Sequence, residues 1–308
     1  MKSEKLSPRQ LAVAVMTGGL STAAAAAGRA DWRWLLLAAV LGTAAAWLLL
    51  LRVGGRPLSP ALRILYGIWA VVLLADVLGR TAGRIQQAGG SEGSIGWLLT
   101  LLAAPLVWMG WGKAAAFFRA VEIFWLAVLV TTAAILLLGV PRMEWRWVLE
   151  PVGDWKSSLL AGALIMSTGL FVLPILYKVE PRQMRDRRGL VWLGTLGLVC
   201  AVLAALTAGL LSPIVAAQLD EPFFAAAGLL GDSARLEGLV SALWLLPDLT
   251  LAGLLAHSWG ERRWPALAVV IAVGLAWVGA VDALPKAALP LGCLALAVLT
   301  AVFPRGGE

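Results

Sequence analysis

Two five-residue stretches, separated by about half of the chain, combine glycine with hydroxyl-bearing residues inside apolar runs. Residues 16–20 read Met-Thr-Gly-Gly-Leu, and residues 166–170 read Met-Ser-Thr-Gly-Leu. Glycine weakens a helix by about 1 kcal/mol relative to alanine, and Thr and Ser hydroxyls can satisfy the backbone groups that an unwound turn sets free. A helix interrupted there would offer N–H groups to an anion and carbonyl groups to a cation.

A free amino acid carries both charges, so two facing interruptions would suit its carboxylate and its amine. The residues predicted to form this site are Thr17, Gly18, Gly19, Ser167, Thr168 and Gly169. The alternative is that these small residues only let neighbouring helices pack closely. The chain has 33 glycines, so chance matches are easy.

Ionisable residues inside apolar runs are costly in a membrane, so each needs a role. Asp248 directly follows Pro247, which kinks a helix because proline lacks an N–H. Its carboxylate could bind an ion, take up a proton or hold a substrate amine, or it could pair with an Arg of a neighbouring helix. Asp76 lies one turn from Arg80, which favours a structural ion pair over a functional one. Tyr66 could offer its hydroxyl to the cavity or simply pack as an aromatic residue.

The composition explains why these residues must act within a membrane. The chain has 308 residues, of which 60% are hydrophobic and 14% are charged, and its mean hydropathy is +0.86. A soluble protein of this size could not bury so much apolar surface, which argues against a soluble enzyme, a nucleic-acid binder and a disordered scaffold. One His and two Cys leave no His-based metal cluster and no Ser–His pair. We therefore expect no enzymatic activity, metal or cofactor.

A hydropathy window of about 19 residues finds ten candidate transmembrane helices. They cover residues 9–27, 33–53, 61–80, 94–112, 119–140, 157–177, 189–211, 235–256, 264–282 and 286–303. The remaining residues form short connections, which predicts one membrane domain over residues 1–308. The longest connection, 212–234, predicts either a short helical hairpin over a vestibule or a helix lying on the membrane.

Ten helices divide into two sets of five, with repeat one at about 9–140 and repeat two at about 157–303. An odd number of spans in each half inverts its orientation, as in many secondary transporters. With a cytoplasmic N-terminus, the inside segments carry the larger share of the 25 Lys and Arg residues, which predicts that both termini are cytoplasmic. The predicted fold is an all-α integral membrane protein with a 5+5 inverted repeat and broken helices one and six.

Four stretches, in order along nearly the whole chain, resemble the spore germination permeases, the B subunits of nutrient germinant receptors. They are Lys5–Leu11 before the first helix, Arg119–Phe124 in the fifth, Leu173-Pro174 in the sixth and Arg235–Trp244 in the eighth. The resemblance implies the amino acid–polyamine–organocation superfamily and residence in the spore inner membrane. It also implies partnership with a receptor A subunit and a lipoprotein C subunit.

The first functional hypothesis is therefore a germinant-receptor subunit that binds a small nutrient, such as an amino acid, at the two breaks. Binding that differs between two conformations would shift the receptor to its active state. One alternative is an active amino-acid or polyamine symporter with Asp248 as its coupling residue. Another is a partner that assembles with the A and C subunits and binds no ligand.

Overall fold

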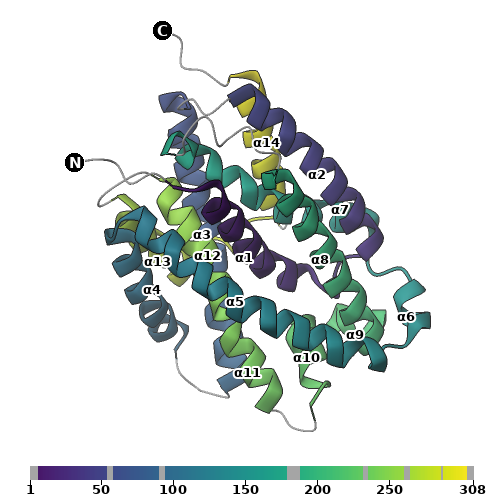
Figure 1. Ribbon diagram of the computed structural model, residues 1–308. Helices are drawn as coiled ribbons and strands as arrows, with labels where there is room; N and C mark the ends of the chain where they lie inside the picture. The colour runs from purple at the N-terminus through teal and green to yellow at the C-terminus, as the bar shows by residue number, and fades with distance from the viewer. Residues whose placement is uncertain are drawn as a thin grey trace.

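The computed structural model describes residues 6–53, 58–89, 94–178, 188–231, 235–259, 264–285 and 287–303. Most of these residues are helical, and none of them belongs to a β-strand. Figure 1 shows the helices gathered into one bundle. The fold of the described residues is all-α, as the sequence predicts.

The first half of the chain forms five long helices. They are α1 (Pro8–Ala26), α2 (Trp32–Val53), α3 (Pro60–Gly89), α4 (Ile95–Trp111) and α5 (Ala114–Gly139). A 3₁₀ turn, η1 (Val140–Arg142), and the short helix α6 (Trp145–Leu149) lead into the second half. The second half contains α7 (Trp155–Ser167), the 3₁₀ helix η2 (Thr168–Lys178), α8 (Arg188–Leu211), α9 (Pro213–Gln218), α10 (Pro222–Gly228), α11 (Arg235–Leu243), α12 (Leu245–Ser258), α13 (Trp264–Trp277) and α14 (Ala288–Val302).

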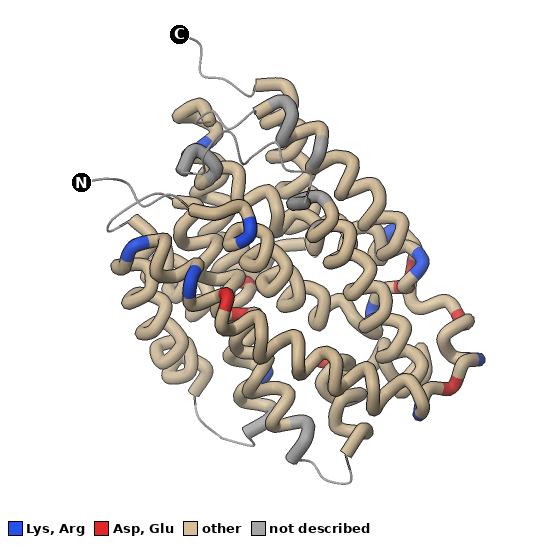
Figure 2. Tube along the Cα trace, viewed as in Figure 1, with Lys and Arg blue, Asp and Glu red and all other residues tan. Residues whose placement is uncertain are grey.

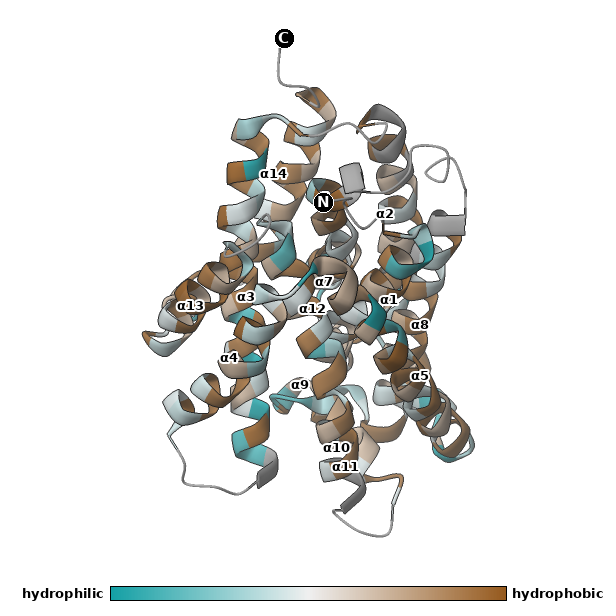
Figure 3. Cartoon of the chain, turned by 60° about the vertical axis from the view of Figure 1, so that its left-hand side comes forward, coloured by the Kyte–Doolittle hydropathy of each residue, from teal (hydrophilic) through white to brown (hydrophobic). Residues whose placement is uncertain are grey.

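The surface of the bundle is apolar over much of its height, as the brown segments in Figure 3 show. Many large apolar side chains are exposed, among them Ile123, Leu137 and Trp108, at 73%, 76% and 81%. So much exposed apolar surface is unfavourable in water. In Figure 2 the charged segments gather mainly toward the ends of the bundle. Among the described residues, five helices are long and apolar enough to cross a membrane: Pro60–Gln87, Ala114–Arg142, Trp155–Ile175, Gly194–Leu211 and Gly238–Ser258. The protein is therefore embedded in a membrane.

Each of the ten predicted ranges overlaps an observed helix or a pair of consecutive helices. In the part of the chain that the structure describes, four further apolar helices are shorter, with 10–17 residues: Trp32–Ala46, Ile95–Trp111, Trp264–Trp277 and Ala288–Val302. The clearest difference in bounds is α3, which continues about two turns beyond its predicted end at residue 80. This extension brings Arg84 into the helix, where it acquires a partner described below.

Helix α1 lies inside the bundle. The Ser7 hydroxyl accepts a hydrogen bond from the Gln10 N–H, and the Gln10 side chain accepts one from the Ser7 N–H, so the two form a capping box. Pro8 fills the first helical position, where no N–H is needed. Every residue of Leu11–Ala24 is buried, and α1 packs against α5, α7, α8 and α12. It is the central element around which the others are arranged.

The predicted interruption of the first helix is wrong, because α1 continues unbroken through both of its glycines. A Cβ atom at Gly18 would lie 3.2 Å from the Cα atom of Leu251 in α12. A Cβ atom at Gly19 would collide with the side chain of Leu196 in α8. The two glycines therefore allow close contact between helices, which is the usual role of small residues in membrane interfaces.

The interruption expected in the sixth helix is present. The α-helix ends at Ser167, and the chain continues as a 3₁₀ helix from Thr168. The Ser167 and Thr168 hydroxyls donate to the carbonyls of Leu164 and Ile165, at 2.6 and 2.8 Å, and so compete with the backbone for these acceptors. Pro174, inside η2, has no N–H to donate and crowds the preceding turn.

The eighth predicted span is divided into α11 and α12 at Trp244. Pro247 accounts for this division, because its ring clashes with the preceding turn and it cannot donate to the carbonyl of residue 243. The helix is therefore interrupted where the sequence predicts a kink. Asp248 lies in the first turn of α12 and is buried.

The two halves of the chain are interleaved. Helix α2 packs against α7 and α8, α3 against α12 and α13, and α4 against α13. Within the second half, α14 packs against α7. Residues from both halves therefore meet at the centre, where the start of η2 lies close to α1, α3 and α12.

Candidate functional site

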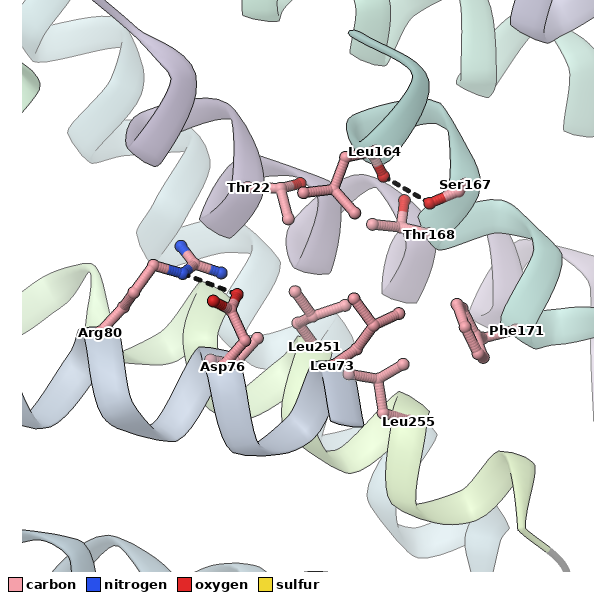
Figure 4. A pocket seen from close by; sticks show the side chains of 11 residues that line it. Thr22, Leu73, Asp76, Arg80, Leu164, Ser167, Thr168, Phe171, Leu251 and Leu255 are labelled. Atoms are coloured by element: carbon pink, nitrogen blue, oxygen red, sulfur yellow. Dashed lines mark hydrogen bonds and ion pairs between the residues drawn. The ribbon is translucent and has the colours of Figure 1, made fainter. Parts of the chain in front are cut away.

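A small cavity lies at the start of η2, between α1, α3, α7 and α12. Its volume is about 10 Å³, which is room for about one water molecule. Its polar lining residues are Thr22, Asp76, Arg80, Ser167 and Thr168, and its apolar ones are Leu73, Val77, Leu164, Phe171, Leu251 and Leu255. In Figure 4 the acid and the base rise from α3, and the three hydroxyl residues lie across from them.

The three hydroxyl groups have already used their hydrogens. Thr22 donates to the Gly19 carbonyl at 2.8 Å, and Ser167 and Thr168 donate to carbonyls of the turn before them. A hydroxyl has one hydrogen and two acceptor lone pairs, so each oxygen can still accept but cannot donate to a solute without breaking its bond. This wall of the cavity is therefore a wall of acceptors.

Arg80 is the positively charged residue on the cavity wall, and it is paired. Its Nε–H donates to Asp76 Oδ2 at 2.9 Å, across one turn of α3. The side chains are 29% and 19% exposed, respectively, so neither is fully enclosed. The pair is electrically neutral and leaves further guanidinium hydrogens and carboxylate lone pairs available to a solute.

A second ion pair lies one turn along α3, outside the cavity. Arg84 donates to Asp248 of α12, and these side chains are only 8% and 5% exposed. The Arg84 guanidinium also lies over the ring of Phe224, 4.5 Å from its centroid, which is a cation–π arrangement. Among the described residues, nothing pairs with the buried Arg84 Nε.

Helix α10 covers this second pair with aromatic side chains. Phe223 and Phe224 are buried, and their ring centroids lie 4.6 and 6.2 Å from that of Trp244. The Trp244 indole N–H donates to the Leu20 carbonyl of α1 at 3.3 Å. Two short helices, α9 and α10, lie in the connection for which the sequence predicts either a helical hairpin or a helix on the membrane, and α10 packs inward against α1, α8 and α11.

Two arginines hold the chain on either side of α10. Arg29, between α1 and α2, donates to the carbonyls of Leu219 and Asp220 at 3.2 and 2.6 Å. Arg142, at the end of η1, donates to the carbonyls of Leu229 and Leu230 at 3.1 and 2.7 Å. The aromatic cover over Arg84 is therefore fastened at both of its ends.

Glu221, directly before α10, is the acid nearest to this cover. Burial raises the pKa of the Glu221 carboxyl, and Asp248 adds to the rise. Arg80, Arg84 and Arg29 oppose it, because a positive charge favours the ionised carboxylate. The direction of the net shift shows that desolvation outweighs the arginines at this position.

The structure brings together only some of the predicted site residues. Ser167, Thr168 and Asp76 line the cavity. Gly169 follows them and is half-buried, but it is not part of the lining. The second half of the predicted site is thus largely at the cavity.

The first half of the predicted site is displaced by about one turn. Thr17, Gly18 and Gly19 are packed among helices, and the Thr17 hydroxyl donates to the Val13 carbonyl at 2.8 Å. Because α1 is unbroken there, these residues offer no free backbone groups. Thr22, one turn later, lines the cavity instead, and nothing in the local sequence marks it.

Two other predicted polar residues lie outside the cavity. The buried Tyr66 hydroxyl shares a hydrogen bond of 2.9 Å with Thr300 of α14. Asp248 pairs with Arg84, which corresponds to the structural alternative stated for it above. Sequence reasoning missed Arg84 because it lay beyond the predicted end of the third helix, although its spacing of four residues from Arg80 places both on one helix face.

A larger hollow of about 430 Å³ lies between α2 and α8. It is lined by Leu36, Ala39, Val40, Thr43, Ala44, Gly194 and Leu198. None of these lining residues is charged, and the one hydroxyl among them, that of Thr43, already donates to the Ala39 carbonyl of its own helix. We therefore place the candidate site at the smaller cavity.

Within the described ranges, no three His, Cys, Asp or Glu side chains gather as metal ligands. The two cysteines, Cys200 and Cys293, are buried and free. The polar residues of the candidate site offer hydrogen bonding and charge. Comparison with known protein families and with curated proteins finds no match to this chain.

Proposed function

We propose that the protein is a permease-like subunit that binds a small nutrient within the membrane. The observation that carries this proposal is the position of the cavity. A helix interruption, three hydroxyl groups and one ion pair meet at a single point among apolar side chains. Polar groups are costly at such a depth, so their convergence favours a binding site over a structural core.

The packing of the helices supports a 5+5 inverted repeat. In such a repeat α1 corresponds to α7, α2 to α8, α3 to α12, α4 to α13 and α5 to α14. The contact between α1 and α5 then corresponds to that between α7 and α14, and the contact between α1 and α8 to that between α7 and α2. The contact between α3 and α4 corresponds to that between α12 and α13. All six of these pairs are in contact. The pairs α2–α8, α3–α12 and α4–α13 exchange into themselves, and they too are in contact. In such repeats the site lies where the two halves meet, as this cavity does.

We further propose that the subunit belongs to a spore germinant receptor of the inner membrane. This step rests on the ordered resemblance to germination permeases, which also supplies the expected A subunit and lipoprotein C subunit. Both termini are assigned to the cytoplasm on the distribution of Lys and Arg. Genes for A- and C-type subunits beside this gene would support the assignment, and a lone gene among transport genes would contradict it.

The ligand that fits this chemistry best is an amino acid. Its ammonium can donate to the acceptor wall and to Asp76, and its carboxylate can accept from Arg80. A cavity of about 10 Å³ is too small for it, so binding must open the site. A ligand that binds only the open conformation shifts the population toward it, as a sensor requires.

Ligand-induced stabilisation of the purified protein tests the proposal. A bound nutrient raises the free energy of unfolding by RT ln(1 + [L]/Kd), so saturating amino acid should raise the thermal midpoint in detergent. Thr168→Val removes one acceptor at nearly constant volume and should weaken this effect. Thr131→Val removes a similar hydroxyl in α5, which donates to the Ala127 carbonyl, and should leave the ligand-induced stabilisation unchanged. No stabilisation by any amino acid would overturn the proposal.

The small size of the cavity favours one rival, a subunit that assembles with its partners and binds no nutrient. The same measurement separates the two, because only a binding subunit is stabilised. Symport is a weaker rival, since its expected coupling residue, Asp248, is already neutralised by Arg84. Gradient-driven accumulation of a labelled amino acid in proteoliposomes would nevertheless establish transport.

A further inference from the structure

We propose that the Asp76–Arg80 pair recognises both charges of a zwitterionic ligand by exchanging partners with it. In the closed site the two side chains neutralise each other. In the occupied site the ligand's ammonium would take Asp76 and its carboxylate would take Arg80. This inference rests on the proposed function and assigns the selectivity of that site to one pair.

The hydrogen bonds around the cavity fix the direction in which the ligand lies. Thr22, Ser167 and Thr168 present acceptors only, because their hydrogens are bound to backbone carbonyls. These oxygens would stabilise an ammonium and repel a carboxylate. The ammonium therefore lies between the acceptor wall and Asp76 of α3, and the carboxylate lies toward Arg80, the donor on the α3 side of the cavity.

Partner exchange conserves charge balance, which matters in a site with little water. A zwitterion replaces one ion pair with two and leaves no charge alone. A ligand with only a carboxylate would displace Asp76 from Arg80 and leave the aspartate unpaired. A ligand with only an ammonium would leave Arg80 unpaired, and an unpaired charge becomes unfavourable once the bound ligand shields it from water.

The apolar lining limits the rest of the ligand. Leu73, Leu251 and Leu255 lie between the two polar walls, and Phe171 closes one end. These groups can surround an aliphatic side chain but offer nothing to a polar one. The class of ligand is therefore a small aliphatic amino acid, and L-alanine is a suitable probe.

The test measures binding of L-alanine, propionate and ethylamine to the purified full chain by titration calorimetry. Propionate is L-alanine without its amine, and ethylamine is L-alanine without its carboxylate. The wild type should bind L-alanine at least about tenfold more tightly than either fragment. Asp76→Asn should weaken the binding of L-alanine by about tenfold or more, so that the variant binds propionate more tightly than L-alanine. Arg80→Gln should weaken the binding of L-alanine to a similar extent, so that this variant binds ethylamine more tightly than L-alanine.

The opposite shifts of the two variants are a result that mere structural damage would not give. The control is Glu144→Gln, which breaks the exposed pair with Arg146 away from the cavity and should leave all three affinities unchanged. If one variant fails to fold, as judged by its thermal unfolding, the other still gives its own reversal.

The outcomes separate this inference from the function on which it rests. L-Alanine binding that both variants retain, with unchanged preference, would overturn the exchange and leave the nutrient site standing. Equal binding of L-alanine and propionate by the wild type would also overturn it. Binding of none of the probes by wild type or variants, together with no stabilisation by other amino acids, would overturn both.

Discussion

Two arginines one turn apart on α3 each pair with an aspartate, but in different surroundings. Arg80 pairs with Asp76 of its own helix on the wall of the cavity. Arg84 pairs with Asp248 of α12 beneath the aromatic residues of α10. The side chains of the first pair are partly exposed, and those of the second pair are buried. The covering element, rather than the residue types, therefore separates a candidate binding pair from a structural one.

The buried pair should dominate the stability of the protein. Arg84→Met leaves Asp248 buried without its counterion, which costs about 3–5 kcal/mol for a buried pair. We expect a large fall in the thermal or denaturant midpoint of the protein in detergent. Asp248→Asn should act in the same direction, since it leaves Arg84 without its charged partner. A loss below about 1 kcal/mol in both variants would mean that the second pair is as accessible as the first.

The double variant Arg84→Met/Asp248→Leu should recover most of that loss. Replacing both members of a buried pair by apolar groups of similar size is often neutral, because the desolvation penalty disappears with the pair. We therefore expect the double variant to unfold within about 1–2 kcal/mol of the wild type. If the double variant remains as unstable as the single variants in the same unfolding assay, the pair contributes through a contact that apolar groups cannot replace.

The cavity pair should contribute much less to stability. Arg80→Gln removes an interaction between partly exposed side chains of one helix, which is worth about 0–1 kcal/mol. The expected result is a nearly unchanged unfolding midpoint together with altered ligand preference. A loss as large as that of Arg84→Met would contradict the distinction between the two pairs.

The main helices of the bundle could be predicted because each is a run of apolar residues long enough to show in a hydropathy window. The end of α3 could not, because Arg80 and Arg84 lower the local hydropathy just where the helix continues. The burial of Arg84 depends on Asp248, which is distant in sequence. A window sees only neighbours along the chain, so it ends the helix too early.

The two glycine stretches show why only half of the site could be predicted. Both combine Gly with hydroxyl residues, yet only the second interrupts its helix. Pro174 follows the second stretch, whereas no proline follows the first within α1. The surroundings of Gly18 differ too, since Leu251 packs directly against it. The local sequence shows where a helix is weakened, but tertiary packing determines whether the helix is interrupted there.

The effect expected to be smallest concerns Glu221, whose carboxyl is influenced by both arginines. Burial raises its pKa in the folded protein above the ordinary value of 4.5. Below that value the carboxyl is protonated in the folded and the unfolded chain alike. As the pH rises above it, the unfolded chain releases the proton first, so the folded state loses stability until its own, higher pKa is passed.

Glu221→Gln removes this loss, because the amide stays neutral at every pH. The variant should therefore gain stability relative to the wild type as the pH rises from about 4, and the gain should level off once the folded protein has ionised. Unfolding midpoints across a pH series measure the difference, and Glu144→Gln, at an exposed pair, should show no such trend. A difference that shrinks with rising pH would mean that the arginines, and not burial, control this carboxyl. The region around Arg84 would then be less sealed than the contacts of Phe224 and Trp244 imply.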